Sequence, residues 1–94
     1  MPERLDDPTI TSRLATLDGW SRVDDEICKQ YQCASFPDAI ALVVRIGFLA
    51  EAANHHPDID IRWRTVHVAL TTHDAGGLSA SDFDLAAQID EAAA

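Results

Sequence analysis

Four histidines are the residues of this chain best suited to proton-transfer chemistry: His55, His56, His67 and His73. The imidazole ring has an unperturbed pKa of about 6.5, so it can donate and accept protons near neutral pH. A cluster of such rings suits general acid and base catalysis, and it equally suits a metal ion. An adjacent pair and a gap of six residues do not match zinc-ligand spacings such as H-E-x-x-H. We therefore expect no metal at these residues.

The adjacent pair lies where a predicted helix gives way to a predicted strand. Pro57 disfavours helical geometry at the preceding residue, so the helix must end at or before His56. The junction that carries His55 and His56 is therefore stiff. A structural role is an open alternative for each histidine taken alone.

The other two histidines belong to the last predicted strand, with His67 in its middle and His73 at its end. At about 3.3 Å per residue they lie about 20 Å apart, so they cannot bind one small ligand. The strand end beside the Gly76-Gly77 loop is the more open position. We expect His73 to join the adjacent pair, and we expect His67 to be a packed or hydrogen-bonded surface residue.

The elements that position these residues follow from capping patterns and periodicity. Asp7 as N-cap with Pro8 predicts a first helix that ends before Gly19. S-x-x-D patterns at Ser35 and Ser79 predict two more helices. The predicted strands are 20–23 and 27–34 in one hairpin and the alternating run 59–71 in a second, and 73–77 is predicted to be a flexible loop.

The predicted order is helix, strand, strand, helix, strand, strand, helix. Because the strands come in hairpins, we expect an α+β sandwich with a four-stranded antiparallel sheet, helices on one face and the other face free. The predicted core face of the middle helix carries Ile40, Val43, Val44, Gly47 and Phe48. Glu51 continues this face, where a solvated rim charge and a functional role are both open.

Composition limits the classes of function. With 94 residues, 47% of them hydrophobic, we expect a single domain over residues 1–94. Sixteen acidic and seven basic side chains give a formal charge of -9, which argues against direct binding to nucleic acid or anionic membranes. The first residues lack an apolar signal segment, and no run approaches the roughly 20 apolar residues of a membrane helix. We expect a cytoplasmic protein, with Cys28 and Cys33 as free thiols about 16 Å apart on one strand.

A larger pattern includes the histidines, and it resembles the pterin-4a-carbinolamine dehydratases. Its centre is E-x-x-x-H-H-P, from Glu51 to Pro57, followed by a histidine at His73. The resemblance extends over nearly the whole chain. Its other parts are Gly19-Trp20, the run from Phe36 to Ala50, Trp63, Val66-His67-Val68, Thr71-Thr72, Gly77-Leu78-Ser79 and Asp82.

The resemblance implies a hydro-lyase that converts a 4a-hydroxytetrahydropterin into quinonoid dihydropterin and water, in tetrahydrobiopterin regeneration. It implies no metal and no organic cofactor. One proton must reach the departing hydroxyl and another must leave N5. The implied catalytic residues are His55, His56, His73 and Glu51, with Glu51 able to orient or polarise the histidine one helical turn away. The implied substrate-binding residues are Asn54, Pro57, Trp63, Thr72 and Asp82.

The resemblance also implies a homodimer or homotetramer that pairs through the sheet edge and the helices. A non-catalytic protein-binding or assembly scaffold of the same fold is the alternative function, because some relatives act as assembly partners. Relatives that have given up catalysis lose motif residues, whereas this sequence retains them. Asn54 replaces a common aspartate and Ile59 a common aromatic residue, so pocket polarity and ring contacts are expected to differ.

Overall fold

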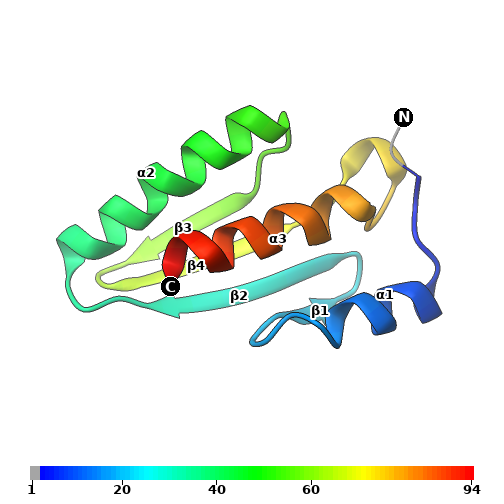
Figure 1. Cartoon of the computed structure of the whole chain (residues 1–94), viewed down its shortest axis with the longest axis horizontal. Coiled ribbons are helices and arrows are strands. Elements are labelled where there is room, and N and C mark those ends of the chain that lie inside the picture. Colours follow the sequence, from blue (N-terminus) through cyan, green and yellow to red (C-terminus); the bar gives the residue numbers. More distant parts are fainter. Residues whose placement is uncertain (1–2) are drawn as a thin grey trace.

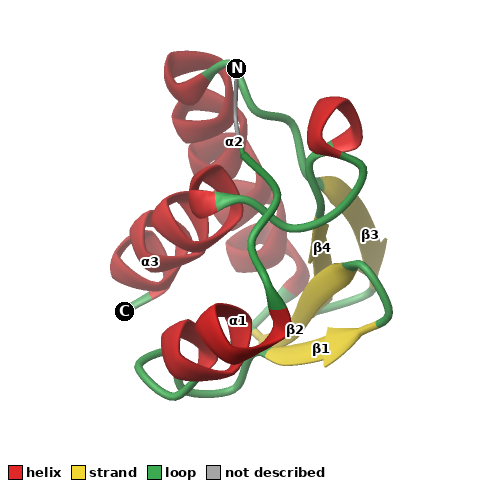
Figure 2. Ribbon diagram, turned by 90° about the vertical axis from the view of Figure 1, so that its right-hand side faces the viewer, coloured by secondary structure: helices red, strands yellow, loops and turns green. Residues whose placement is uncertain are grey.

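The computed structural model describes residues 3–94. Its elements are α1 (Asp7–Leu14), β1 (Ser21–Val23), β2 (Glu26–Gln32), α2 (Phe36–Ala53), β3 (Asp58–Arg62), β4 (Thr65–Leu70), the 3₁₀ turn η1 (His73–Ala75) and α3 (Ala80–Ala93). The strands form one antiparallel sheet in the order β1-β2-β4-β3. Helices α2 and α3 lie side by side over the sheet (Figures 1 and 2). The predicted α+β fold and its element order are confirmed.

Side-chain caps fix where the helices begin. The Ser35 hydroxyl accepts the Asp38 N–H at 3.2 Å and starts α2. Ser79 caps α3 in a capping box with Asp82. Helix α1 begins one residue earlier than predicted, because Asp6 rather than Asp7 accepts the Thr9 N–H, at 2.9 Å. Within residues 3–94 there is no helix both long and apolar enough to cross a membrane.

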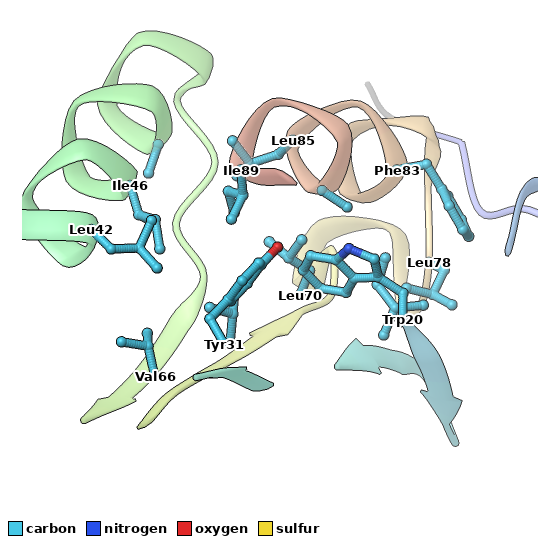
Figure 3. Packing of buried hydrophobic residues seen from close by; sticks show 14 of the residues in the cluster. Trp20, Tyr31, Leu42, Ile46, Val66, Leu70, Leu78, Phe83, Leu85 and Ile89 are labelled. Carbon is cyan, nitrogen blue, oxygen red and sulfur yellow. The ribbon is translucent and has the colours of Figure 1, made fainter. Parts of the chain in front are cut away.

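The core lies between the sheet and the helices. Tyr31, Val66 and Leu70 point from the sheet toward the helices, where they meet Ile46 and Ile89 (Figure 3). Alternate residues of β2 and β4 point away from the helices and are only half-buried or exposed. Within residues 3–94, the opposite face of the sheet is therefore uncovered.

The predicted core face of α2 is wrong. The buried residues of this helix are Ala39, Leu42, Ile46 and Ala50. The exposed apolar residues are Phe36, Ile40, Val44 and Phe48, and Phe48 is 76% exposed. Because α2 is apolar on two faces, periodicity alone did not distinguish the face that packs from the face that is exposed.

Two strand predictions also need correction. Trp63 and Arg64 form the two-residue turn between β3 and β4, with Trp63 at φ 53°, although alternation placed Trp63 in a strand. Cys33 lies just beyond β2, where the first hairpin was predicted to continue to residue 34. Both cysteines are free thiols, as predicted.

A carboxylate on α3 ties the helix layer to the sheet. Asp90 accepts hydrogen bonds from Trp20 Nε1 at 3.1 Å, from Lys29 Nζ at 2.8 Å and from the Tyr31 hydroxyl. Burial works to raise the pKa of Asp90, but the hydrogen bonds from Lys29, Tyr31 and Trp20 outweigh it and hold that pKa below its ordinary value. The network stabilises the contact between α3 and β2.

Candidate active site

The C-terminal end of α2 turns the chain so that two histidines follow it directly. Asn54 adopts the left-handed conformation (φ 49°, ψ 44°), which ends the helix. The His55 N–H donates to the Ala50 carbonyl at 3.0 Å, and the Asn54 N–H donates to the Glu51 carbonyl at 3.2 Å. This pair of bonds is a Schellman motif, in which asparagine is the usual substitute for glycine. Asn54 therefore has a structural role that the sequence pattern did not reveal.

His55 is held by a carboxylate from another part of the chain. Its Nε2 lies 2.6 Å from Oδ1 of Asp82, which is in the first turn of α3. The His55 side chain is 14% exposed and the Asp82 side chain is fully buried. This bond joins the end of α2 to the start of α3, which lie at the same end of the molecule in Figure 1.

The second oxygen of Asp82 is occupied as well. Oδ2 accepts the Thr72 hydroxyl at 2.8 Å and the Ser79 N–H at 2.9 Å. Thr72 Oγ1 also lies 2.7 Å from Ser79 Oγ, and because Thr72 gives its only hydroxyl proton to Asp82, Ser79 is the donor in that contact. Asp82 therefore acts both as the capping-box residue of α3 and as the partner of His55.

This network fixes which ring nitrogen of His55 is available. A carboxylate only accepts hydrogen bonds, so Nε2 carries the proton shared with Asp82. Nδ1 is then the nitrogen left to exchange a proton with another molecule. Asp82 and Thr72, which were predicted to bind substrate, are both buried, and their side chains are hydrogen-bonded to protein groups.

His56 has a different and more exposed partner. Its Nε2 lies 2.9 Å from Glu51 Oε1, with side-chain exposures of 62% and 82%. Glu51 was predicted to act on the histidine one helical turn away, which is His55. The structure instead pairs Glu51 with His56 and leaves His55 to Asp82.

His73 lies in a loop that the same network anchors. It begins η1 directly after Thr72, and its side chain is exposed. Backbone hydrogen bonds of 3.1 and 3.3 Å between Thr72 and Gly77 close the loop. The predicted flexible loop is therefore a closed turn. Since Thr72 binds Asp82, the chain that carries His73 is attached to the residue that holds His55.

Trp63 and His67 are not part of this group. The β3–β4 turn that carries Trp63 lies at the other end of the sheet from the C-terminal end of α2 (Figure 1). It is about 17 Å of strand beyond Asp58. Within one chain Trp63 therefore cannot reach a ligand at His55. His67 lies in the middle of β4 on the uncovered face of the sheet, half-buried, which agrees with its predicted surface position. Pro57 is half-buried between His56 and β3.

The side chains at this end of the molecule do not form a metal-binding set. No three histidine, cysteine, aspartate or glutamate side chains in the described residues, 3–94, are placed to hold a metal ion. What the group offers is one ring fixed by a buried carboxylate, a second ring paired with a surface carboxylate, and a third on the neighbouring loop. This arrangement is suited to moving protons.

The fold is that of a small α+β protein, and three of its histidines, His55, His56 and His73, lie at the end of α2 and in the loop before α3. The family model described as pterin 4 alpha carbinolamine dehydratase matches residues 3–92, and the chain belongs to that family, a family of hydro-lyases. Relatives whose names include pterin-4-alpha-carbinolamine dehydratase are similar along nearly their whole length. One from Roseiflexus sp. (strain RS-1) is 64% identical over 97% of this chain and 98% of its own. One from Nocardia farcinica is 57% identical over 97% of this chain and 96% of its own.

The fold also has a close match among solved structures. A crystal structure described as that of a transcriptional coactivator/pterin dehydratase from Brucella melitensis superimposes with a TM-score of 0.94. The two sequences are 28% identical, and the match covers 98% of this chain and 100% of the other.

Proposed function

We propose that this protein dehydrates a 4a-hydroxytetrahydropterin to quinonoid dihydropterin and water, and so serves tetrahydrobiopterin regeneration. The observation that carries the proposal is the bond between His55 and the buried Asp82, which leaves one imidazole nitrogen fixed and free for proton transfer. Family membership supplies the substrate class.

The reaction needs two proton transfers and no change in oxidation state. The bond between C4a and the hydroxyl oxygen breaks, and that oxygen leaves as water after receiving a proton. The proton on N5 departs, and its electron pair forms the new double bond between N5 and C4a. One histidine acting as acid and another as base complete the reaction without changing the net protonation of the enzyme.

The residues divide into three roles in this proposal. His55, through Nδ1, and His73 exchange the two protons, one acting as acid and the other as base. His56, paired with Glu51, contributes to binding or orientation of the pterin. Asp82 is a positioning residue, since it touches His55 rather than the substrate. Thr72 and Ser79 keep Asp82 in place.

The dehydration assay tests the proposal directly. A 4a-hydroxytetrahydropterin is generated in situ by a pterin-dependent hydroxylase, and its decay is followed by absorbance with and without this protein. We expect catalytic amounts of the protein to accelerate the decay well beyond the spontaneous rate. An unchanged decay rate with folded protein would reject the enzyme proposal.

A protein-binding scaffold of the same fold is the second candidate. It is favoured by the exposed apolar stripe of α2, defined as Phe36, Ile40, Val44 and Phe48, and by the coactivator description of the Brucella protein. A folded protein without dehydratase activity would favour this candidate. The complete set of motif histidines supports the enzyme.

Self-assembly is the proposed use of that stripe. Its members are spaced by four residues, so they form one continuous apolar face on α2 that points away from the core. Strand β3 is an edge strand, and one of its sides has no sheet partner in the described part of the chain. We propose a homodimer or homotetramer that uses the α2 stripe and the sheet edge, because a large exposed apolar patch on a small protein is typical of an interface.

A further inference from the structure

The uncovered face of the sheet contains a hollow of about 500 Å³. None of the residues proposed for catalysis lines it. It lies over β2, β4 and β3 and reaches Ser21 of β1, whereas the histidine group lies at the end of α2 and in the loop before α3. It is large enough for a small organic molecule.

The strand register explains why the sheet is hollow here. Cys28, Ala69 and Asp58 are direct neighbours across β2, β4 and β3, so two small side chains form a low floor. The next row on the same face holds the longer side chains Gln30, His67 and Asp60. This second row forms a polar wall beside the floor.

The polar groups of the hollow are available to a ligand. Asp60 binds Arg62 at 3.1 Å, whereas the structure gives Asp58, Gln30 and His67 no side-chain hydrogen-bond partner within residues 3–94. Gln30 and His67 can each donate or accept, and Asp58 can accept from a cation. A ligand here would therefore gain hydrogen bonds without breaking any that the protein makes.

The charge of the hollow selects the ligand. Asp58 and Asp60 border it, and the lysine of β2 directs its ammonium to the helix side, where Lys29 Nζ lies 2.8 Å from Asp90 and from the Asp18 carbonyl. Lys29 therefore does not pair with the border carboxylates. Asp60 is already paired with Arg62, whereas Asp58 has no cationic partner within residues 3–94, and its free carboxylate disfavours carboxylates and phosphates in the hollow. Burial and the neighbouring Glu26 raise the pKa of the Cys28 thiol, so the floor is uncharged as well.

From these contacts we infer that the hollow on the uncovered sheet face is a second binding site, for a small primary amine that carries a flat apolar ring. The ring lies on the floor formed by Cys28 and Ala69. The ammonium group donates to Asp58, and Gln30 and His67 offer hydrogen bonds at the wall. The inference does not depend on the dehydratase activity, since the site shares no residue with the histidine group.

Nuclear magnetic resonance titration of the full chain tests this site with phenethylamine as the probe. We expect saturable shifts at Cys28, His67 and Ala69, and affinity about tenfold or more above that for 3-phenylpropionate, the anionic analogue. Asp58→Asn is expected to weaken phenethylamine about fivefold, as for loss of an exposed ion pair. Glu91→Gln, which removes one charge from an exposed position on α3, is the matched control and is expected to leave affinity unchanged.

A filled floor gives a second test. Ala69→Met is expected to abolish the shifts, whereas Gln32→Met, on the same face of β2 but outside the hollow, retains them. Equal weakening by Asp58→Asn and Glu91→Gln would show attraction to net charge alone and overturn the site. Shifts confined to His55, His56 and His73 would place the amine in the catalytic group, and absence of saturable shifts would mean that the hollow binds no such ligand. Either result overturns the inference.

Discussion

His55 Nε2 lies 2.6 Å from Asp82 Oδ1, although 27 positions separate the two residues in the sequence. The ring meets a carboxylate that is fully buried and that also caps α3. One residue thus stabilises a helix, closes the β4–α3 loop through Thr72 and orients the histidine. Positioning of His55 and stability of the fold are coupled at Asp82.

Replacing Asp82 with asparagine tests this coupling. An amide that keeps its oxygen toward the donors of Thr72 and Ser79 turns its NH₂ group toward His55 Nε2, which must then accept, so the ring proton moves to Nδ1 and the available nitrogen is lost. The opposite orientation loses the bonds from Thr72 and Ser79. We expect the dehydration rate of folded protein to fall by about 100-fold. The free energy of unfolding is expected to fall by about 1–3 kcal/mol. Steady-state kinetics and urea denaturation measure the two effects.

Asp84→Asn is the matched control for that experiment. Asp84 is exposed on α3 and makes a surface pair with Arg13 at 3.1 Å, so its loss should change stability by at most about 1 kcal/mol and leave the rate unchanged. If Asp82→Asn changed only KM and retained the wild-type kcat, the result would contradict a role for Asp82 in positioning the reacting ring.

The Asp90 network predicts how stability depends on pH. Because hydrogen bonds hold the pKa of Asp90 below its ordinary value, its carboxylate stabilises the fold above about pH 4, and this contribution is lost as pH falls through the folded-state pKa. Burial and the bond to Asp90 raise the pKa of Tyr31, so its contribution is present below about pH 10 and is lost above it.

Asp90→Asn is therefore expected to lower the free energy of unfolding by about 1–3 kcal/mol at pH 7, with allowance for partial exposure of the pair with Lys29. The loss should be smaller at pH 3, because the carboxylate of the unfolded wild type is largely protonated there and the charge-dependent part of its contribution has begun to fall. Urea denaturation at the two pH values measures it. A loss of equal size at both would mean that the carboxylate charge contributes nothing.

The α2 stripe predicts the oligomeric state. We expect wild-type protein to be a dimer or tetramer at about 10 μM, and Phe48→Glu to shift it to a smaller species, because a charge would be buried in the interface. Light scattering measures the mass. Gln88→Glu adds the same charge at an exposed position on α3 and should leave the mass unchanged. A monomeric wild type would refute the assembly.

Treatment with a chelator is expected to leave both fold and activity intact. The proton transfers are assigned to imidazoles, and the family resemblance implies no metal. Activity that disappears with EDTA and returns with stoichiometric zinc would contradict this expectation. Circular dichroism in the same samples reports whether the fold is retained.

Local signals predicted most of the fold. The helix starts at Ser35 and Ser79 were visible because capping is decided within four residues. The core face of α2 was not visible in the sequence, because Ile40 and Phe48 are as apolar as Leu42 and Ile46. Only the packing partners decide which face is buried. The strand alternation continued through Trp63 because period alone carries no information on turn geometry.

The sequence pattern indicated which residues to consider for the candidate site, but it did not indicate how they bond to one another. The motif identified His55 and Asp82, but no local spacing could indicate a bond between them, since the β3–β4 hairpin and the loop before α3 must fold first. A signal for burial of Asp82 was present, because Leu78, Phe83 and Leu85 surround it in sequence and all are buried. The role of Asn54 as the residue that ends α2 was also not recognised from the sequence.

The dehydration rates of His55→Ala, His73→Ala and His67→Ala, measured side by side on folded protein, test the central claim most directly. We predict that His55→Ala and His73→Ala each lower the rate by about 100-fold or more, and that His56→Ala has a smaller effect. We predict that His67→Ala retains the wild-type rate, because the His67 ring lies on the face of the sheet opposite to the helices. Loss of turnover in His67→Ala with full turnover in His55→Ala and His73→Ala would contradict the account.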